Sequence, residues 1–208
     1  MKRFLSVILA LTFLPLLFSC SKPDYNVTEI DGYIVEESEA PTNYVRIVMK
    51  NGDAMLLELY PDEAPITVAN FKKLVAEKYY DGTTFHRVIS GFMIQGGEAG
   101  KSRPTIKGEF RYNGVNNMIK HERGVISMAR NGINFNSAST QFFIVHQTSR
   151  DNSDSLDGQY AAFGKLLAGY GTLDKIASVK TGKRDEPKSK QQMAEVRFVN
   201  IVSTPDAK

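Results

Sequence analysis

The chain has 208 residues, of which 42% are apolar and 24% are charged, and its formal net charge is +3. This length is enough for one domain with a sizeable core, and the composition excludes an intrinsically disordered chain. Its basic residues are scattered rather than clustered, so the sequence gives no sign of a nucleic-acid-binding surface.

The first twenty residues differ in kind from the rest. A basic start, MKR, precedes an apolar run from Phe4 to Phe18, which is too short to span a bilayer comfortably and indicates a secretory signal. The run ends in LFSC, which resembles the lipobox of bacterial lipoproteins, where the cysteine is lipidated and becomes the mature N-terminus. We therefore expect a signal peptide over residues 1–19 and a lipid on Cys20. The protein would then be anchored in the bacterial cell envelope, on the periplasmic side or at the outer membrane.

Residues 20–40 are polar and acidic with no sustained period, and they predict a flexible tether to a domain over residues 41–206. The domain opens with a predicted hairpin, because apolar runs at 44–50 and 54–60 flank Asn51-Gly52-Asp53. A helix is expected next, in APITVANFKKLVAEKYY, with Thr67 as its N-terminal cap.

The rest of the chain alternates short apolar stretches with turn residues. A second helix is predicted in TLDKIASV, with Thr172 as its cap. Many short strands and only two helices predict a closed antiparallel barrel or a sandwich, and periodicity alone leaves both open. The stretches that favour strands are FHRVI, FMIQ, GVISMA, TQFFIVH, YAAFGKLL and EVRFVNIV.

The stretch FHRVISGFMIQGG carries an arginine in the middle of a strand-like run. A three-residue loop centred on Gly91 would pair Arg87 with Gln95. A two-residue loop would instead put Ile94 opposite Arg87, so the pairing depends on the register. In the first register, one face of the hairpin carries Arg87, Ile89, Met93 and Gln95.

Five motifs in order resemble the cyclophilin-type peptidyl-prolyl cis-trans isomerases over roughly residues 41–203: APITVANF, YYDGTTFHRVISGFMIQGG, GVISMAR, STQFFIV and LDGQYAAFGK. The resemblance implies a mainly β fold, a closed eight-stranded antiparallel β-barrel capped by two α-helices, with the site on its outer face. It also implies the reaction, which is cis/trans rotation about the bond preceding proline. No cofactor, metal or covalent intermediate is implied.

The resemblance also assigns roles to individual residues. Arg87 is the catalytic donor aimed at the prolyl nitrogen, and its rigid guanidinium is expected to be held by Gln95 as well. The remaining matches are the proline pocket of Phe92, Met93, Phe143 and Leu156, the backbone-binding groove of Gln95, Ala129 and Gln141, and the edge positions His86 and Tyr160.

The chain departs from the family pattern in three places. The loop MARNGINFNSASTQ is a residue or two longer than in the familiar members, so the stretch 130–135 receives no role. Ser155 stands where members that bind cyclosporin tightly have a tryptophan, and Tyr160 stands where the best-known eukaryotic members have a histidine. We therefore expect weak cyclosporin binding. The charged segment 181–192 is interpreted as a surface loop without a catalytic task.

Two functions of different classes fit these residues. The first is a monomeric, lipid-anchored isomerase that acts on proline-containing polypeptides and assists the folding of envelope proteins. The second is a binding module that holds proline-containing segments in the same groove, with incidental turnover. Loss of the arginine would favour the module, and Arg87 is present. A purely structural envelope protein has little support, because such a protein has no reason to keep this face.

Overall fold

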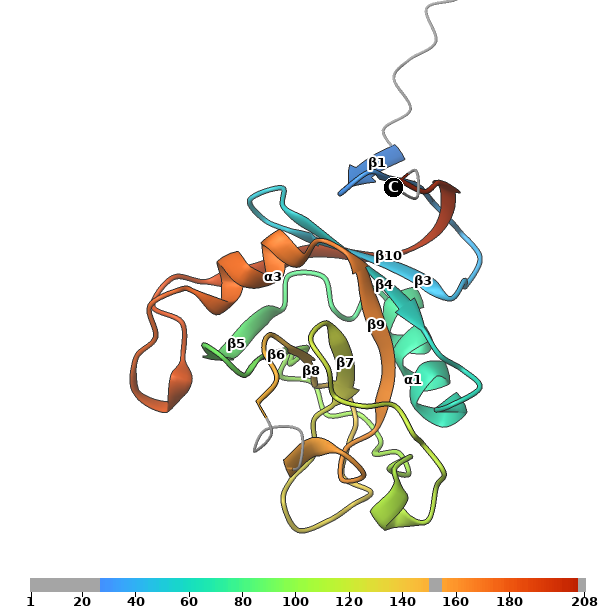
Figure 1. Ribbon diagram of the computed structural model, residues 1–208, viewed down its shortest axis with the longest axis vertical. Coiled ribbons are helices and arrows are strands. Elements are labelled where there is room, and N and C mark those ends of the chain that lie inside the picture. The colour runs from blue at the N-terminus through green and yellow to red at the C-terminus, as the bar shows by residue number, and fades with distance from the viewer. Residues whose placement is uncertain (1–26, 150–154, 206–208) are drawn as a thin grey trace, which may run out of the picture.

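The computed structural model describes residues 27–149 and 155–205 (Figure 1). The predicted signal peptide, the lipidated Cys20 and the first part of the predicted tether lie outside these residues. The helices are α1 (Pro65–Ala76) and α3 (Tyr170–Ala177), and two short 3-10 turns are η1 (Arg111–Asn113) and η2 (Lys183–Asp185). The strands are β1 (Val27–Ile30), β2 (Tyr33–Glu37), β3 (Tyr44–Met49), β4 (Ala54–Leu59), β5 (Thr84–Ile89), β6 (Met93–Gly96), β7 (Val125–Met128), β8 (Phe142–Val145), β9 (Ala162–Ala168) and β10 (Gln191–Ser203).

The strands form one antiparallel sheet in the order β1-β2-β10-β3-β4-β9-β7-β8-β6-β5. A further pairing, Gln191 with Phe85 and Gln192 with Thr84, joins β10 to β5 and closes the strands from β10 to β5 into a barrel. The predicted eight-stranded barrel is confirmed, and the sandwich is excluded. Closure removes the edges of these eight strands.

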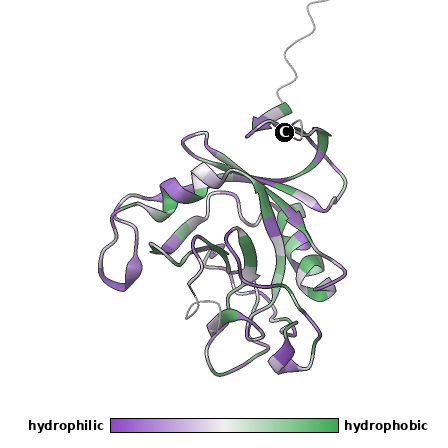
Figure 2. Cartoon of the chain, viewed as in Figure 1, coloured by the Kyte–Doolittle hydropathy of each residue, from purple (hydrophilic) through white to green (hydrophobic). Residues whose placement is uncertain are grey.

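Strand alternation divides the apolar side chains into an inner and an outer set. Ile94 on β6 and Phe142 on β8 lie in the barrel core, whereas their neighbours Met93 and Phe143 lie in a separate apolar cluster. Figure 2 shows this mixture of hydrophobic and hydrophilic residues along the barrel strands. Helix α1 packs Phe71 of its inner face against Phe142 at a ring-centroid distance of 5.7 Å. The outer cluster is therefore not needed to fill the barrel.

Both predicted helix caps are wrong. Helix α1 begins at Pro65, so Thr67 lies inside its first turn, and the capping carboxylate comes from Glu109. The Glu109 oxygens accept hydrogen bonds from the backbone N–H of Ile66 (3.0 Å) and of Thr67 (2.7 Å), and from the Thr67 hydroxyl (2.7 Å). Helix α3 begins at Tyr170, and the Thr172 hydroxyl donates to the carbonyl of Ala54 instead.

We expect Glu109→Ala to destabilise the fold, because Glu109 is only 2% exposed and its loss leaves the buried N–H of Thr67 without an acceptor. One unsatisfied buried donor of this kind costs about 1–3 kcal/mol of unfolding free energy. Urea denaturation of both proteins measures the difference. The matched control is Glu63→Ala, which removes an exposed carboxylate next to the same helix and should stay within about 0.5 kcal/mol of wild type. Equal losses in the two variants would contradict this role of Glu109.

The structure differs from the predicted tether over residues 27–37, which form the hairpin β1–β2. Strand β2 pairs with the second half of β10, from Val199 opposite Glu37 to Ser203 opposite Ile34. Val35 is fully buried there against Leu56 and Val199. These residues were predicted to be flexible because the segment 20–40 is polar and acidic with no sustained period. Their partner strand lies more than a hundred residues away along the chain.

Candidate active site

The hairpin β5–β6 has the register that the three-residue loop predicts. Arg87 lies opposite Gln95 and Ile89 opposite Met93, and the N–H of Phe92 donates to the carbonyl of Ile89 at 3.0 Å. Gly91 has φ +77°, in the left-handed region that favours glycine. The alternative register with Ile94 opposite Arg87 is wrong, because Ile94 lies opposite Val88.

A pocket opens on the outer face of the barrel, next to this hairpin, with a volume of about 130 Å³. Its apolar wall includes Met93 of β6, Phe143 of β8 and Leu156, which are almost completely buried there. Tyr160 packs edge-on against Phe143 with ring centroids 5.6 Å apart. Eight of the predicted site residues line this one pocket: Arg87, Phe92, Met93, Gln95, Ala129, Phe143, Leu156 and Tyr160.

Arg87 is at the polar side of the pocket, and its side chain is 43% exposed. Its Nε donates a hydrogen bond to Oδ2 of Asp185 at 3.2 Å. The Nε2 of Gln95 donates to Oε1 of Gln141 at 2.8 Å. The expectation that Gln95 holds the guanidinium is therefore wrong for this structure, because Gln95 is engaged with Gln141 and Arg87 with Asp185.

Gln141 lines a second, polar hollow of about 230 Å³ that shares Gln95, Ala129 and Arg130 with the pocket. The N–H of Ala129 donates to the carbonyl of Gln141 at 2.9 Å, which fixes the two strand ends to each other. Because the two hollows share these walls, they adjoin and form one groove with an apolar end and a polar end. A peptide chain bound along it would meet side-chain amides beyond the apolar pocket.

Arg130 had no role in the sequence interpretation, yet it lines both hollows. Its guanidinium carbon lies 4.6 Å from the ring centroid of Tyr160, 4.9 Å from that of Phe135 and 5.4 Å from that of Phe110. Its Nε donates to the carbonyl of Gln159 at 2.9 Å. Contact with aromatic faces stabilises a cation at such a position. The only signal in the sequence was that Arg130 directly follows Ala129, a predicted groove residue.

A buried histidine supports Phe143 from behind. The His121 ring stacks on Phe143 with centroids 5.9 Å apart, Nδ1 lies 3.0 Å from Oδ1 of Asp157, and Nε2 lies 3.0 Å from Oγ of Ser127. Burial lowers the pKa of His121, which favours the neutral ring. A neutral ring with its proton on Nδ1 donates to Asp157 and accepts from the Ser127 hydroxyl. This chain of contacts fixes one wall of the pocket.

His86 does not line the pocket with the other predicted site residues. It lies at the bulge between Phe85 and Arg87, where the register of β5 against β6 shifts. Its Nε2 is 4.0 Å from Oε2 of Glu98, and its buried Nδ1 has no hydrogen-bond partner among the residues described. The predicted substrate contact of His86 therefore stays a prediction.

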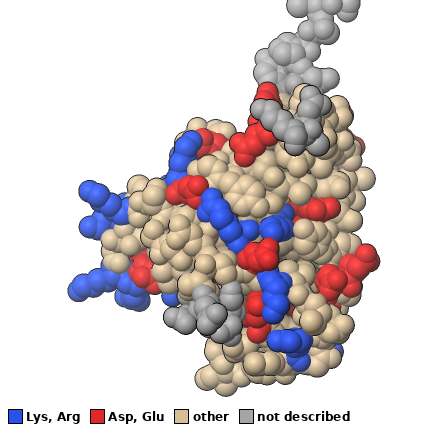
Figure 3. Space-filling view, viewed as in Figure 1, with Lys and Arg blue, Asp and Glu red and all other residues tan. Residues whose placement is uncertain are grey.

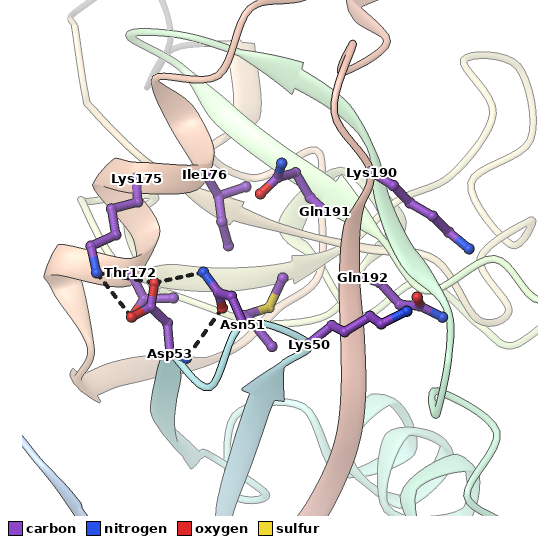
Figure 4. Close-up of a pocket in the computed structure, with 10 residues that line it drawn as sticks. Lys50, Asn51, Asp53, Thr172, Lys175, Ile176, Lys190, Gln191 and Gln192 are labelled. Carbon is purple, nitrogen blue, oxygen red and sulfur yellow. Dashed lines mark hydrogen bonds and ion pairs between the residues drawn. The ribbon is translucent and has the colours of Figure 1, made fainter.

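A larger hollow of about 340 Å³ lies elsewhere, between the β3–β4 turn, α3 and the start of β10 (Figure 4). It is lined largely by polar and charged side chains, and its ion pair joins Lys175 to Asp53 at 2.9 Å. Its lining residues include no aromatic side chain and no arginine, unlike those of the pocket beside Arg87. Across residues 27–149 and 155–205, no cluster of histidine, cysteine, aspartate or glutamate side chains has the arrangement of a metal site.

A family model described as "Cyclophilin type peptidyl-prolyl cis-trans isomerase/CLD" matches residues 44–198. The chain belongs to the cyclophilin family. The matched residues span the barrel from the first residue of β3 into β10 and include every residue of the pocket and groove. The family assignment thus rests on the part of the chain that builds the site.

Relatives from a plant and from a bacterium share this part of the chain. Peptidyl-prolyl cis-trans isomerase CYP18-1 of Arabidopsis thaliana is 40% identical over 148 residues, which are 69% of this chain and 86% of the relative. Peptidyl-prolyl cis-trans isomerase B of Bacillus subtilis is 43% identical over 127 residues, which are 59% of this chain and 82% of the relative.

A solved structure shares the fold. The cyclophilin-type isomerase of Cryptosporidium parvum, crystallised in the presence of the dipeptide Ala-Pro, superposes with a TM-score of 0.65 at 30% identity. The match covers 77% of this chain and 99% of that one. This cyclophilin is a peptidyl-prolyl cis-trans isomerase, as the sequence resemblance implied.

Proposed function

We propose that this cyclophilin is a lipid-anchored isomerase that assists the folding of envelope proteins, with Arg87 as its catalytic donor. The single observation that carries the catalytic part is the position of a charged guanidinium at the polar side of an open pocket with an apolar wall. That pocket lies on the outer face of the barrel, so a polypeptide reaches it without entering the core.

The physics of the X-Pro bond explains why an arginine and an apolar cup suffice. Amide resonance sets a rotation barrier of about 18–20 kcal/mol, and the uncatalysed exchange takes tens to hundreds of seconds. Twisting the bond breaks the resonance and localises the lone pair on the prolyl nitrogen. A donor aimed at that nitrogen stabilises the twisted state more than either planar state, and this difference is what lowers the barrier.

The pocket and the groove would divide the remaining work. Phe92, Met93, Phe143 and Leu156 hold the proline ring by apolar contact, which leaves the acyl side of the bond free to rotate. Gln95 and Gln141 bind the backbone next to the ring by hydrogen bonds. No bond is made or broken in this mechanism. Because the groove contacts the proline ring and the peptide backbone of the substrate, the enzyme would accept many proline-containing substrates.

The competing hypothesis is a binding module that holds proline-containing segments without isomerising them. An exchange assay on the mature chain with a proline peptide separates the two, because only an enzyme accelerates cis/trans exchange at substoichiometric amounts. We expect acceleration that saturates with peptide concentration. Peptide binding without acceleration would favour the module and contradict the proposed role of Arg87.

The proposed anchor predicts that Cys20→Ala releases the protein from membranes into the soluble envelope fraction. No helix of the described residues has the length and apolar content needed to cross a bilayer. We propose that the lipid on Cys20 provides the whole attachment to the membrane. Fractionation of cells with and without detergent, followed by immunoblotting, measures the release. Ser21→Ala, which changes the neighbouring residue, is the control and should stay with the membranes. A Cys20→Ala protein that stays with the membranes would show that another segment anchors it.

A further inference from the structure

The pairing of Arg87 with Asp185 joins the proposed active site to a segment that the sequence interpretation left without a task. Asp185 is the last residue of η2, in the loop between α3 and β10. The two side chains meet at 3.2 Å, and each is 43% exposed. Their positions differ by 98 residues along the chain, so the contact depends on the closed fold.

The loop that carries Asp185 has a defined shape. It is pinched at its base by an isolated bridge between Thr181 and Pro187 and by hydrogen bonds from Gly182 to the carbonyl of Glu186 and from Lys188 to the carbonyl of Lys180, both 2.8 Å. Arg184 and Asp185 at its tip both have φ +62°, in the left-handed region. Side chains other than glycine adopt this region at a cost and keep it where the surroundings hold them there.

The charge around Asp185 is mostly of the opposite sign. The loop is hydrophilic in Figure 2, and basic side chains project from that edge of the molecule in Figure 3. The sequence from Thr181 to Lys190 holds four basic residues, Lys183, Arg184, Lys188 and Lys190, and two acidic ones. Of the two acids, Asp185 contacts Arg87, whereas no ion pair of Glu186 is found within the described chain.

The nitrogen of Arg87 that Asp185 contacts determines which N–H donors remain for a substrate. A guanidinium has five N–H donors in a rigid plane, one on Nε and four on the two Nη atoms. Asp185 takes the Nε donor, and no other described residue forms a hydrogen bond or ion pair with Arg87. Both Nη groups therefore stay available to a substrate, while the plane of the guanidinium is held from its Nε edge.

We propose that Asp185 is a positioning residue for the isomerisation: it holds the guanidinium of Arg87 so that the Nη donors face the prolyl nitrogen. This inference rests on the proposed role of Arg87. An arginine side chain has several rotatable bonds, and an unanchored one loses rotameric freedom each time it aligns with a substrate. The Asp185 carboxylate also offsets part of the guanidinium charge, and this effect alone would weaken catalysis. Solvent screens that charge effect at these exposures, so we expect orientation to prevail.

The test compares Asp185→Asn with Glu186→Gln in the full mature chain. Asparagine keeps the shape of aspartate and tolerates the left-handed backbone, and each variant removes one negative charge from the same loop. Removing an exposed ion pair of this kind is expected to lower the rate constant by about two- to fivefold. We expect Asp185→Asn to lower kcat by this factor with KM nearly unchanged, and Glu186→Gln to match wild type. Equal melting temperatures show that both variants fold.

A double-mutant cycle gives a readout that a purely structural role would not move. In an Arg87→Ala background, Asp185→Asn should cause no further loss, because nothing is left to position. Three results would overturn the inference: an unchanged or raised kcat for Asp185→Asn, an equal loss for Glu186→Gln, or the same fold loss in the Arg87→Ala background. Wild-type turnover that does not depend on Arg87 would instead refute the proposed function itself, so the two failures are distinguishable.

Discussion

Arg87→Ala is expected to lower kcat/KM at least tenfold, because the charge that favours the twisted amide is gone. Removing one preorganised hydrogen-bond donor that stabilises a developing charge commonly lowers the rate about 10²–10³-fold. The fold should persist, since the side chain is 43% exposed and its ion pair with Asp185 contributes little to stability. Exchange kinetics with a proline peptide measure the loss, and thermal melting checks the fold.

The matched control is Arg103→Ala. Arg103 has a comparable exposure of 34% and its own ion pair with Glu77 at 2.8 Å, but it does not line the pocket. This variant should keep wild-type turnover. Arg87→Lys adds a second comparison, since it keeps the charge and loses the planar fork. An Arg87→Ala protein with wild-type turnover would refute the assignment.

The second prediction concerns inhibition by cyclosporin. Ser155 is exposed and directly precedes Leu156, which lines the pocket. The sequence resemblance implies that members of the family that bind cyclosporin tightly have a tryptophan at this place, with its indole packed against the inhibitor. A lost tryptophan contact at the centre of a tight interface costs about 2 kcal/mol or more, which corresponds to at least about tenfold weaker binding. We expect Ser155→Trp to restore part of that affinity.

An inhibition titration of the native and Ser155→Trp proteins, with turnover measured in parallel, decides this. Turnover should survive in both, because the proline ring depends on Phe92, Met93, Phe143 and Leu156. Ser155→Leu is the control for added apolar area without an indole, and it should gain less. Nanomolar inhibition of the native protein, or no gain from tryptophan, would show that Ser155 does not occupy the position we assign to it.

The parts of the site that the sequence predicts are those that neighbouring residues determine. The left-handed Gly91 permits a three-residue turn, and that turn sets Arg87 opposite Gln95. Alternation along β6 and β8 then places Met93 and Phe143 on the outer face. Family motifs supplied the identity of the walls, since apolar residues on a strand do not by themselves distinguish a pocket from a core.

Contacts between distant residues could not be predicted in the same way. Asp185 meets Arg87 across 98 positions, and Glu109 caps α1 from 42 positions after Thr67. No sequence pattern distinguishes either acid from an ordinary surface charge. The strand β2 was missed for a similar reason, because its short apolar run lies within an acidic segment and its partner strand β10 is distant in the sequence.

The position of β10 as the last strand along the described chain also sets when the enzyme can form. This strand pairs with β2, β3 and β5, so it joins residues near both ends of the chain (Figure 1). A chain is synthesised from its N-terminus, and these long-range pairings cannot begin until β10 has been made. Folding dominated by such distant contacts is slow. A growing chain therefore has no closed barrel until β10 has been made, and the isomerase becomes active only after that strand has been synthesised.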